Sequence, residues 1–290
     1  MKKIIFLITV FSITIFSCKS EKTDTNKIEN TTEETTGTNK IVSLNGAITE
    51  TIAALGVSNK IVGKDVTSTF PAGITAPELG HVRSMTIEPI MSVSPNLILA
   101  SEKDINPDLI TKIKESKIKM TLVKQEYSVD GAKNLIKQVA EAIGQTSYQS
   151  LIDKIDTDLL EVKPIETNPK VLFIYARGTG NIMVAGQNTP MDALISMAGG
   201  QNAITGFDNF KPLTPEAVVQ GNPDVILMFD SGIQSLGGID GVLKTPGIEQ
   251  TNAGKNKKVI TMDGALISNF GPRTGEAIIE LNKLLIDSAK

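Results

Sequence analysis

An internal duplication constrains the fold of this chain more than any other feature of its sequence. The segments SMTIEPIMSVSPNLILA (84–100) and PLTPEAVVQGNPDVILM (212–228) carry Thr, Glu, Pro, Ile and Leu at the same steps, 128 residues apart. A second pair, LGVSNKIVG (55–63) and AGGQNAITG (198–206), repeats Gly, Asn, Ile and Gly. Two such matches in one order argue against chance. A repeated supersecondary unit predicts two similar lobes.

The repeated segments have the pattern of an α/β protein. A short helix is expected after Thr86 and after Thr214, and each helix ends before a turn that contains proline. The apolar run that follows is typical of a buried strand. Helical patterns also precede the second repeated pair, at 47–55 and 190–198. We therefore predict two Rossmann-like α/β lobes.

A helical segment lies between the two lobes. In residues 129–164, apolar side chains recur at helical spacing, which predicts one long interdomain helix or two abutting ones. Pro164 ends this segment, and KVLFIY then begins the first strand of the second lobe. The predicted boundaries are 41–128 for the N-terminal lobe, 129–164 for the linking helix and 165–290 for the C-terminal lobe.

The first forty residues predict export and a lipid anchor. Two lysines precede a short apolar run in MKKIIFLITVFSITIFSC, which predicts a signal peptide over 1–17. The run ends in a pattern resembling a bacterial lipobox, so Cys18 is expected to be lipidated; the alternative is an uncleaved anchor with an incidental cysteine. Residues 18–40 are rich in Thr, Glu, Lys and Asn and predict a disordered tether.

Composition excludes several classes of function. The net charge is −3 with no basic patch, which argues against nucleic acid as a partner. Cys18 is the only cysteine and His81 the only histidine, so neither an internal disulfide nor a multi-histidine metal site can form. No G-x-S-x-G elbow, G-x-G-x-x-G or phosphate-binding P-loop motif occurs, and we expect no enzymatic activity.

The combined features resemble the helical-backbone class of ABC-transporter substrate-binding proteins, and within it the haemin-binding lipoproteins. The resemblance covers Ile41 to Arg273 and is carried by IVSLNGAITETIAALG, VTSTFP, LGHVRSMTIEPIMSVSPNLILAS, MVAGQNTPMDALISMAGGQNA and FKPLTPEAVVQGNPDVILM. It implies a periplasmic binding protein fold that binds haem (iron protoporphyrin IX) and delivers it, unconverted, to an ABC permease dimer with its ATPase. The alternative is a ferric-siderophore or cobalamin binding protein of the same class.

The resemblance implies an iron ligand. The family's usual axial ligand is a tyrosine in a Gly-Tyr-x-Arg context, which reads Gly80-His81-Val82-Arg83 in this chain. His81 therefore occupies the ligand position, and imidazole nitrogen is also a standard haem ligand. Arg83 would pair with a haem propionate. The competing interpretation is that the single histidine has no role.

Further candidates for the haem pocket come from both lobes. Tyr175 and Arg177 follow the strand VLFIY, at the carboxyl edge where ligands of α/β sheets collect. Tyr175 is either a second iron ligand or a packing residue. Lys211, the repeat counterpart of Arg83, and Arg273, in a Gly-Pro-Arg turn, are either propionate partners or solvated charges. Three apolar side chains either line the pocket or pack in the core: Phe70, Met85 and Phe210.

The duplicated glutamates are candidates for docking to the permease. In the resembled class, one surface carboxylate per lobe meets arginines of the permease dimer, and Glu88 and Glu216 match that pattern. Both also fall in the first turn of a predicted helix, where a carboxylate complements the helix dipole. We expect a monomer, held by its lipid anchor alone at the periplasmic face or the cell surface.

Overall fold

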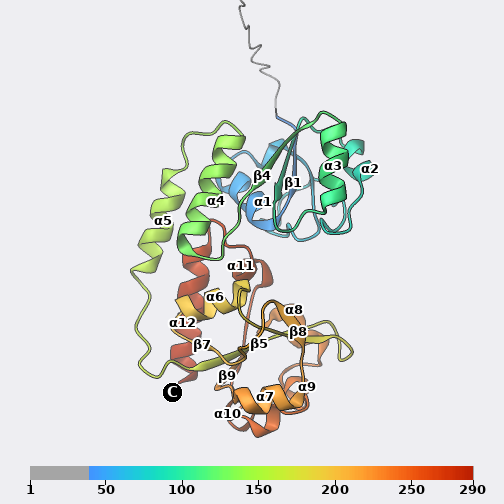
Figure 1. The fold of residues 1–290 in the computed structure, drawn as a ribbon. Coiled ribbons are helices and arrows are strands. Elements are labelled where there is room, and N and C mark those ends of the chain that lie inside the picture. Colours follow the sequence, from blue (N-terminus) through green and yellow to red (C-terminus); the bar gives the residue numbers. More distant parts are fainter. Residues whose placement is uncertain (1–38, 290) are drawn as a thin grey trace, which may run out of the picture. The chain divides into compact units, whose positions relative to one another are not determined.

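Two β-sheets with helices on both faces form the framework of the protein (Figure 1). The structure is a computed structural model that describes residues 39–289. The predicted signal peptide, Cys18 and nearly all of the predicted tether lie outside the described residues. The described residues belong to a single compact unit.

The sheet of the first lobe is entirely parallel. It contains β1 (Ile41–Leu44), β2 (Ile61–Lys64), β3 (Leu97–Ser101) and β4 (Lys119–Val123), in the order β2-β1-β3-β4. Successive strand residues alternate between two buried clusters: Ile41 packs with α1 (Gly46–Ala54), whereas Val42 packs with α2 (Ile87–Ser92) and α3 (Pro107–Glu115). Because helices cover both faces, the two central strands, β1 and β3, are buried at every residue.

The sheet of the second lobe is mixed. Its path is β10 (Val259–Met262), β9 (Val225–Phe229), β5 (Lys170–Ala176), β6 (Ile182–Ala185) and β8 (Phe210–Pro212), with β7 (Gln201–Asn202) beside β5. β5, β9 and β10 are parallel, whereas β6 and β8 add an antiparallel pair. The helices of this lobe are α6 (Pro190–Met197), α7 (Pro215–Gly221), α8 (Asp230–Ser235), α9 (Ile239–Leu243), α10 (Asn252–Lys255) and α11 (Gly264–Ser268).

The repeated sequence segments fold as predicted. The segment after Thr86 forms α2 and then β3, and the segment after Thr214 forms α7 and then β9. The Thr214 hydroxyl accepts a hydrogen bond from the Ala217 N–H and so caps α7. The α/β prediction is confirmed, although the two lobes differ because only the second sheet has antiparallel strands.

A bundle of three helices connects the lobes. α4 (Val129–Ala142) and α5 (Gln149–Leu159) replace the single long helix that was one of two expectations, and α12 (Thr274–Ser288) packs beside both (Figure 1). Gly144 lies just beyond the end of α4, and its φ of 74° is in the left-handed region that favours glycine. Within residues 39–289, no helix has both the length and the apolar character needed to cross a bilayer.

Candidate functional site

A cleft lined by residues of both lobes is the candidate site. Its volume is about 520 Å³, within the range of small-molecule sites. The first lobe and α11 contribute Leu44, Asn45, Gly46, Thr67, His81, Val82, Arg83, Asp104, Gln125, Tyr127, Ser268 and Asn269. The remaining lining residues are Tyr175, Arg177, Met183, Pro190, Met191, Phe210 and Phe229.

Parallel strand order explains why the first lobe's polar residues gather here. Asn45 follows β1, Thr67 lies beyond β2, Asp104 follows β3, and Gln125 and Tyr127 follow β4. The carboxyl ends of parallel strands meet at one edge of a sheet, and that edge faces the cleft. Sequence analysis missed Asp104 and Tyr127, although the same rule applied to β3 and β4 would have found both.

The loop that carries His81 is held by buried polar contacts. The fully buried carboxylate of Asp65 accepts hydrogen bonds from the hydroxyls of Thr67 and Ser68, each at 2.6 Å. The Val66 N–H donates to the Gly80 carbonyl at 3.1 Å. Gly80 has a φ of 116°, which a residue with a side chain rarely adopts. This geometry delivers His81 to the cleft.

His81 and Arg83 flank a buried residue. The side chain of Val82 packs in the core of the first lobe and is 3% exposed, whereas both of its neighbours are exposed. The backbone N–H of Arg83 donates to Nδ1 of His81 at 3.3 Å. In the neutral imidazole this arrangement leaves the proton on Nε2. For Nε2 to bind a metal, its proton must move to Nδ1, and the hydrogen bond from Arg83 must then break.

Arg83 already has an anionic partner. Its Nη2 atom lies 2.7 Å from Oδ1 of Asp104. Tyr127 lies close by, with the Lys103 ammonium 4.9 Å from its ring centroid. Burial, and then the Asp104 charge, raise the pKa of the Tyr127 phenol. Tyr127 therefore stays protonated at neutral pH and can donate a hydrogen bond into the cleft.

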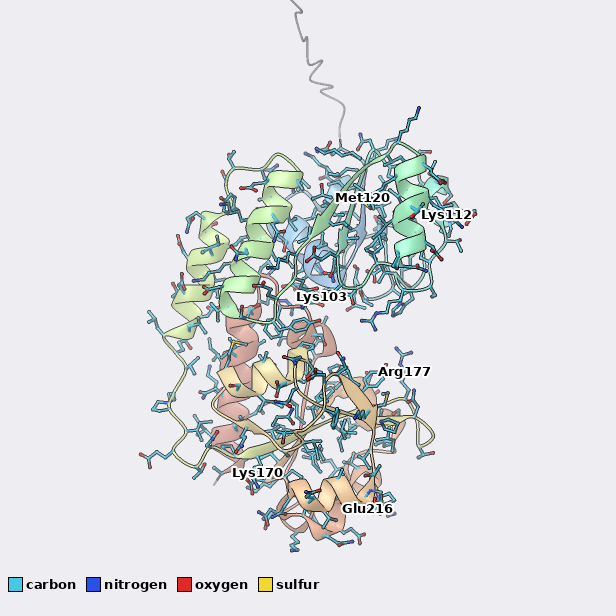
Figure 2. The ribbon with its side chains drawn as sticks, viewed as in Figure 1. Lys103, Lys112, Met120, Lys170, Arg177 and Glu216 are labelled. Carbon is cyan, nitrogen blue, oxygen red and sulfur yellow. The ribbon has the colours of Figure 1, made fainter. Side chains whose placement is uncertain are left out.

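The second lobe provides an aromatic wall and one cation. Tyr175 is half-buried at the end of β5, and its ring meets that of Phe229 edge to face at 5.9 Å. The Arg177 guanidinium lies 5.6 Å from the Tyr175 ring centroid. Phe210 is 37% exposed and forms another part of the wall. Figure 2 shows Arg177 on the face of the second lobe that is turned toward the first.

Three of the expected pocket residues do not line the cleft: Phe70, Lys211 and Arg273. Strand alternation puts Lys211 on the opposite face of β8 from Phe210, with its Nζ 4.6 Å from the Phe207 ring centroid. Arg273 stacks on Phe70, with 3.5 Å between the guanidinium carbon and the ring centroid, beyond the cleft lining. A fourth candidate, Met85, is buried in the core of the first lobe.

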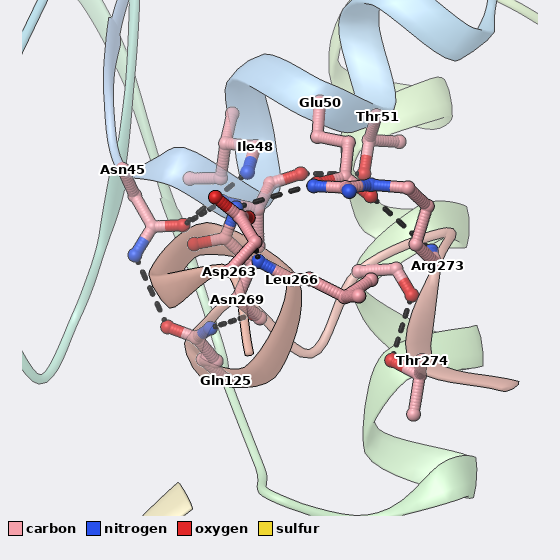
Figure 3. A network of polar contacts seen from close by, with 12 residues as sticks. Asn45, Ile48, Glu50, Thr51, Gln125, Asp263, Leu266, Asn269, Arg273 and Thr274 are labelled. Carbon is pink, nitrogen blue, oxygen red and sulfur yellow. Dashed lines mark hydrogen bonds and ion pairs between the residues drawn. The ribbon is translucent and has the colours of Figure 1, made fainter. Parts of the chain in front are cut away.

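Hydrogen bonds join three residues of the cleft lining, Asn45, Gln125 and Asn269, to Glu50 and Arg273, and so connect the first lobe with the C-terminal part of the chain (Figure 3). The Asn45 amide donates to Oε1 of Gln125 at 3.1 Å, and Nε2 of Gln125 donates to the Asn269 carbonyl at 2.7 Å. Asn269 and Arg273 in turn donate to the Glu50 carboxylate, at 3.3 and 3.0 Å. We call these five residues the interlobe seam.

We expect Arg273→Ala to destabilise the protein through the interlobe seam. The Glu50 side chain is 3% exposed, and removing the guanidinium leaves a buried carboxylate without a counter-charge. Breaking such a pair costs about 3 kcal/mol. In a chain of this size that cost corresponds to a fall in Tm of roughly 6–12 °C by thermal unfolding. Lys137→Ala, which removes the exposed pair with Glu141, is the control and should shift Tm by about 1 °C. Equal shifts in both variants would contradict a special role of the seam.

Comparison with known proteins identifies the family. The profile of the periplasmic binding protein family matches residues 41–266. The chain belongs to this family. Periplasmic binding proteins bind ligands and do not convert them, which confirms the prediction that the chain is not an enzyme.

Relatives of this periplasmic binding protein agree in sequence and structure. YvrC of Bacillus subtilis, an uncharacterized ABC transporter substrate-binding lipoprotein, is 28% identical over 250 residues, covering 83% of this chain and 78% of its own. The haem-binding protein RhuT from Roseiflexus sp. RS-1 is 36% identical with a TM-score of 0.84, covering 88% and 100% of the two chains. The haem-binding protein BhuT, solved with two haems, is 32% identical with a TM-score of 0.83 and the same coverage.

Proposed function

We propose that this protein binds haem outside the cytoplasm and delivers it to an ABC importer. The observation that carries the proposal is an exposed imidazole next to an arginine, His81 and Arg83, in a two-lobed cleft with an aromatic wall. The similarity to the haem-binding proteins RhuT and BhuT supports the same ligand class.

The chemistry of haem matches the residues of the cleft. Haem is a flat apolar ring with a central iron and two carboxylates, so its site needs an axial donor, apolar walls and cations. His81 would supply the axial nitrogen, and Tyr175, on the opposite wall, is the candidate second ligand. Met183, Phe210 and Phe229 would pack on the ring. The cations for the propionates would be one per lobe, Arg83 and Arg177.

Absorbance titration of the purified protein with haemin tests the proposal. We expect a saturable change of the Soret band at one or two equivalents, because axial ligation and burial in an apolar site both alter the spectrum of haem. The principal alternative is a ferric-siderophore binding protein of the same class. That alternative would be favoured if the protein left the Soret band of haemin unchanged and a ferric siderophore quenched its tyrosine fluorescence.

Delivery would use the paired short helices α2 and α7. Glu88 and Glu216 are exposed in the first turns of these helices, and Met91 and Val219 are exposed one turn later, 43% and 39%. Glu88 and Glu216 occupy equivalent steps of the repeat, as do Met91 and Val219. Figure 2 shows Glu216 at the outer side of the second lobe, on α7. A carboxylate beside an apolar side chain on each lobe fits a two-fold permease dimer.

The anchor forms the remaining part of the proposal. Cleavage before Cys18 and lipidation of its thiol would hold a monomer at the membrane surface without a spanning helix. YvrC, the relative from Bacillus subtilis, is described as a lipoprotein, which supports this arrangement.

A further inference from the structure

The two arginines of the cleft differ in their surroundings. Arg83 is paired with Asp104 at 2.7 Å, whereas Arg177 lies against the Tyr175 ring and makes no ion pair with any residue of 39–289. The Arg83 side chain is 71% exposed and that of Asp104 is 20% exposed. The cleft therefore contains one arginine that is available to an anion and one that is already neutralised.

Asp104 is placed to compete with a ligand. It lines the same cleft as Arg83, beyond the carboxyl end of β3, and its carboxylate has the chemistry of a propionate. A carboxylate that pairs bidentately with an arginine uses two parallel N–H donors, and Asp104 already accepts a hydrogen bond from Nη2 of Arg83. A ligand carboxylate that pairs through Nη2 must displace Asp104, and in any geometry it must approach the negative charge of Asp104.

We propose that Asp104 is an internal competitor for Arg83 that weakens the binding of a dicarboxylate ligand and so favours its release. This inference rests on the proposed function, because it takes haem as the ligand. Arg177 would bind one propionate without competition. The second propionate would bind Arg83 only by exchange with Asp104, so the ligand is held less tightly at the first lobe than at the second.

Equilibrium binding of haemin to four forms of the full-length protein tests the proposal: unmutated, Asp104→Asn, Arg83→Ala and the double variant. We expect Asp104→Asn to tighten haemin binding about fivefold, the upper range for an exposed ion pair. The gain should shrink at high salt, because the Debye length falls to about 3 Å at 1 M. It should largely disappear in the Arg83→Ala background, since no guanidinium is left to release.

A ligand without carboxylates isolates the charge effect. The dimethyl ester of haemin keeps the ring and the iron but has no propionate charge, so Asp104→Asn should leave its affinity unchanged. Asp153→Asn, on the exposed face of α5, makes the same change in net charge away from the cleft. It should alter neither the affinity for haemin nor the affinity for the dimethyl ester.

Several results would overturn the proposal. Unchanged or weaker haemin binding by Asp104→Asn would show that Asp104 has no effect or orients Arg83 for the ligand. An equal gain for the ester, or an undiminished gain without Arg83, would also contradict competition. No saturable haemin binding by the unmutated protein would overturn the proposed function and this inference with it. If the unmutated protein binds haemin but one of the contradicting results for Asp104→Asn is found, the proposed function stands and only the competition by Asp104 is overturned.

Discussion

Replacing His81 by alanine is expected to weaken haemin binding by about 100-fold or more. Loss of a residue that merely supports a metal ligand costs about 10- to 100-fold, and loss of the ligand itself should cost at least as much. Arg177, the aromatic wall and Tyr175 would provide the binding that remains. The measurement is one spectral titration per variant, with the haem in ferric and in dithionite-reduced form.

His81→Tyr and Thr69→Ala are the matched variants for this experiment. A tyrosine at position 81 should retain haem, shift the ferric spectrum toward a high-spin phenolate complex and disfavour the reduced state. Thr69 is exposed in the same loop but does not line the cleft, so its replacement should leave the titration unchanged. If His81→Ala matches the unmutated protein in spectrum and affinity, His81 is not the ligand and Tyr175 becomes the leading candidate.

The double variant Glu88→Ala, Glu216→Ala should abolish permease-dependent haem uptake and leave haemin affinity unchanged. Neither glutamate lines the cleft, and they occupy equivalent steps of the repeat, one per lobe. A hydrogen bond from the Thr86 side chain lowers the pKa of Glu88, so this carboxylate is ionised at neutral pH and available to a cationic partner. Uptake in cells that contain the transporter and haemin titration of the purified variant are the two measurements.

Glu115→Ala with Glu249→Ala is the control for the docking variant. It also removes one exposed glutamate from each lobe, so the change in net charge is the same. Uptake by this control should be normal. Normal uptake by the Glu88/Glu216 variant, or loss of its haemin binding, would contradict the docking role.

The helices and strands could be predicted from the sequence because apolar periodicity and turn residues act over a few neighbouring positions. The repeats indicated α2, α7 and the strands that follow them, and the carboxyl edge of β5 indicated that Tyr175 and Arg177 would reach the cleft. His81, Val82 and Arg83 also line the cleft, and the burial of Val82 leaves the side chains of its two neighbours exposed.

The contacts that the sequence did not indicate join distant parts of the chain. The repeat makes Lys211 equivalent to Arg83 in sequence. Lys211, however, lies on β8, an antiparallel edge strand with no counterpart in the first sheet, and strand alternation there turns it away from Phe210. The sequence also did not indicate that Arg273 pairs with Glu50, because the two residues are 223 positions apart and no local pattern links them. Asp104 is a different case, because the rule that placed Tyr175 at the carboxyl edge of β5 applies equally to the residues after β3.

The pairing of Glu50 with Arg273 also bears on the order in which the chain folds. Domains fold in the order of synthesis, N-terminal part first. The first lobe can form its four parallel strands early, but the Glu50 carboxylate obtains its guanidinium only after residue 273 has been made. Until then the Glu50 carboxylate, which is buried in the folded protein, has to remain hydrated. A nascent chain that ends before Arg273 could therefore form the parallel sheet of the first lobe but not the ion pair with Glu50.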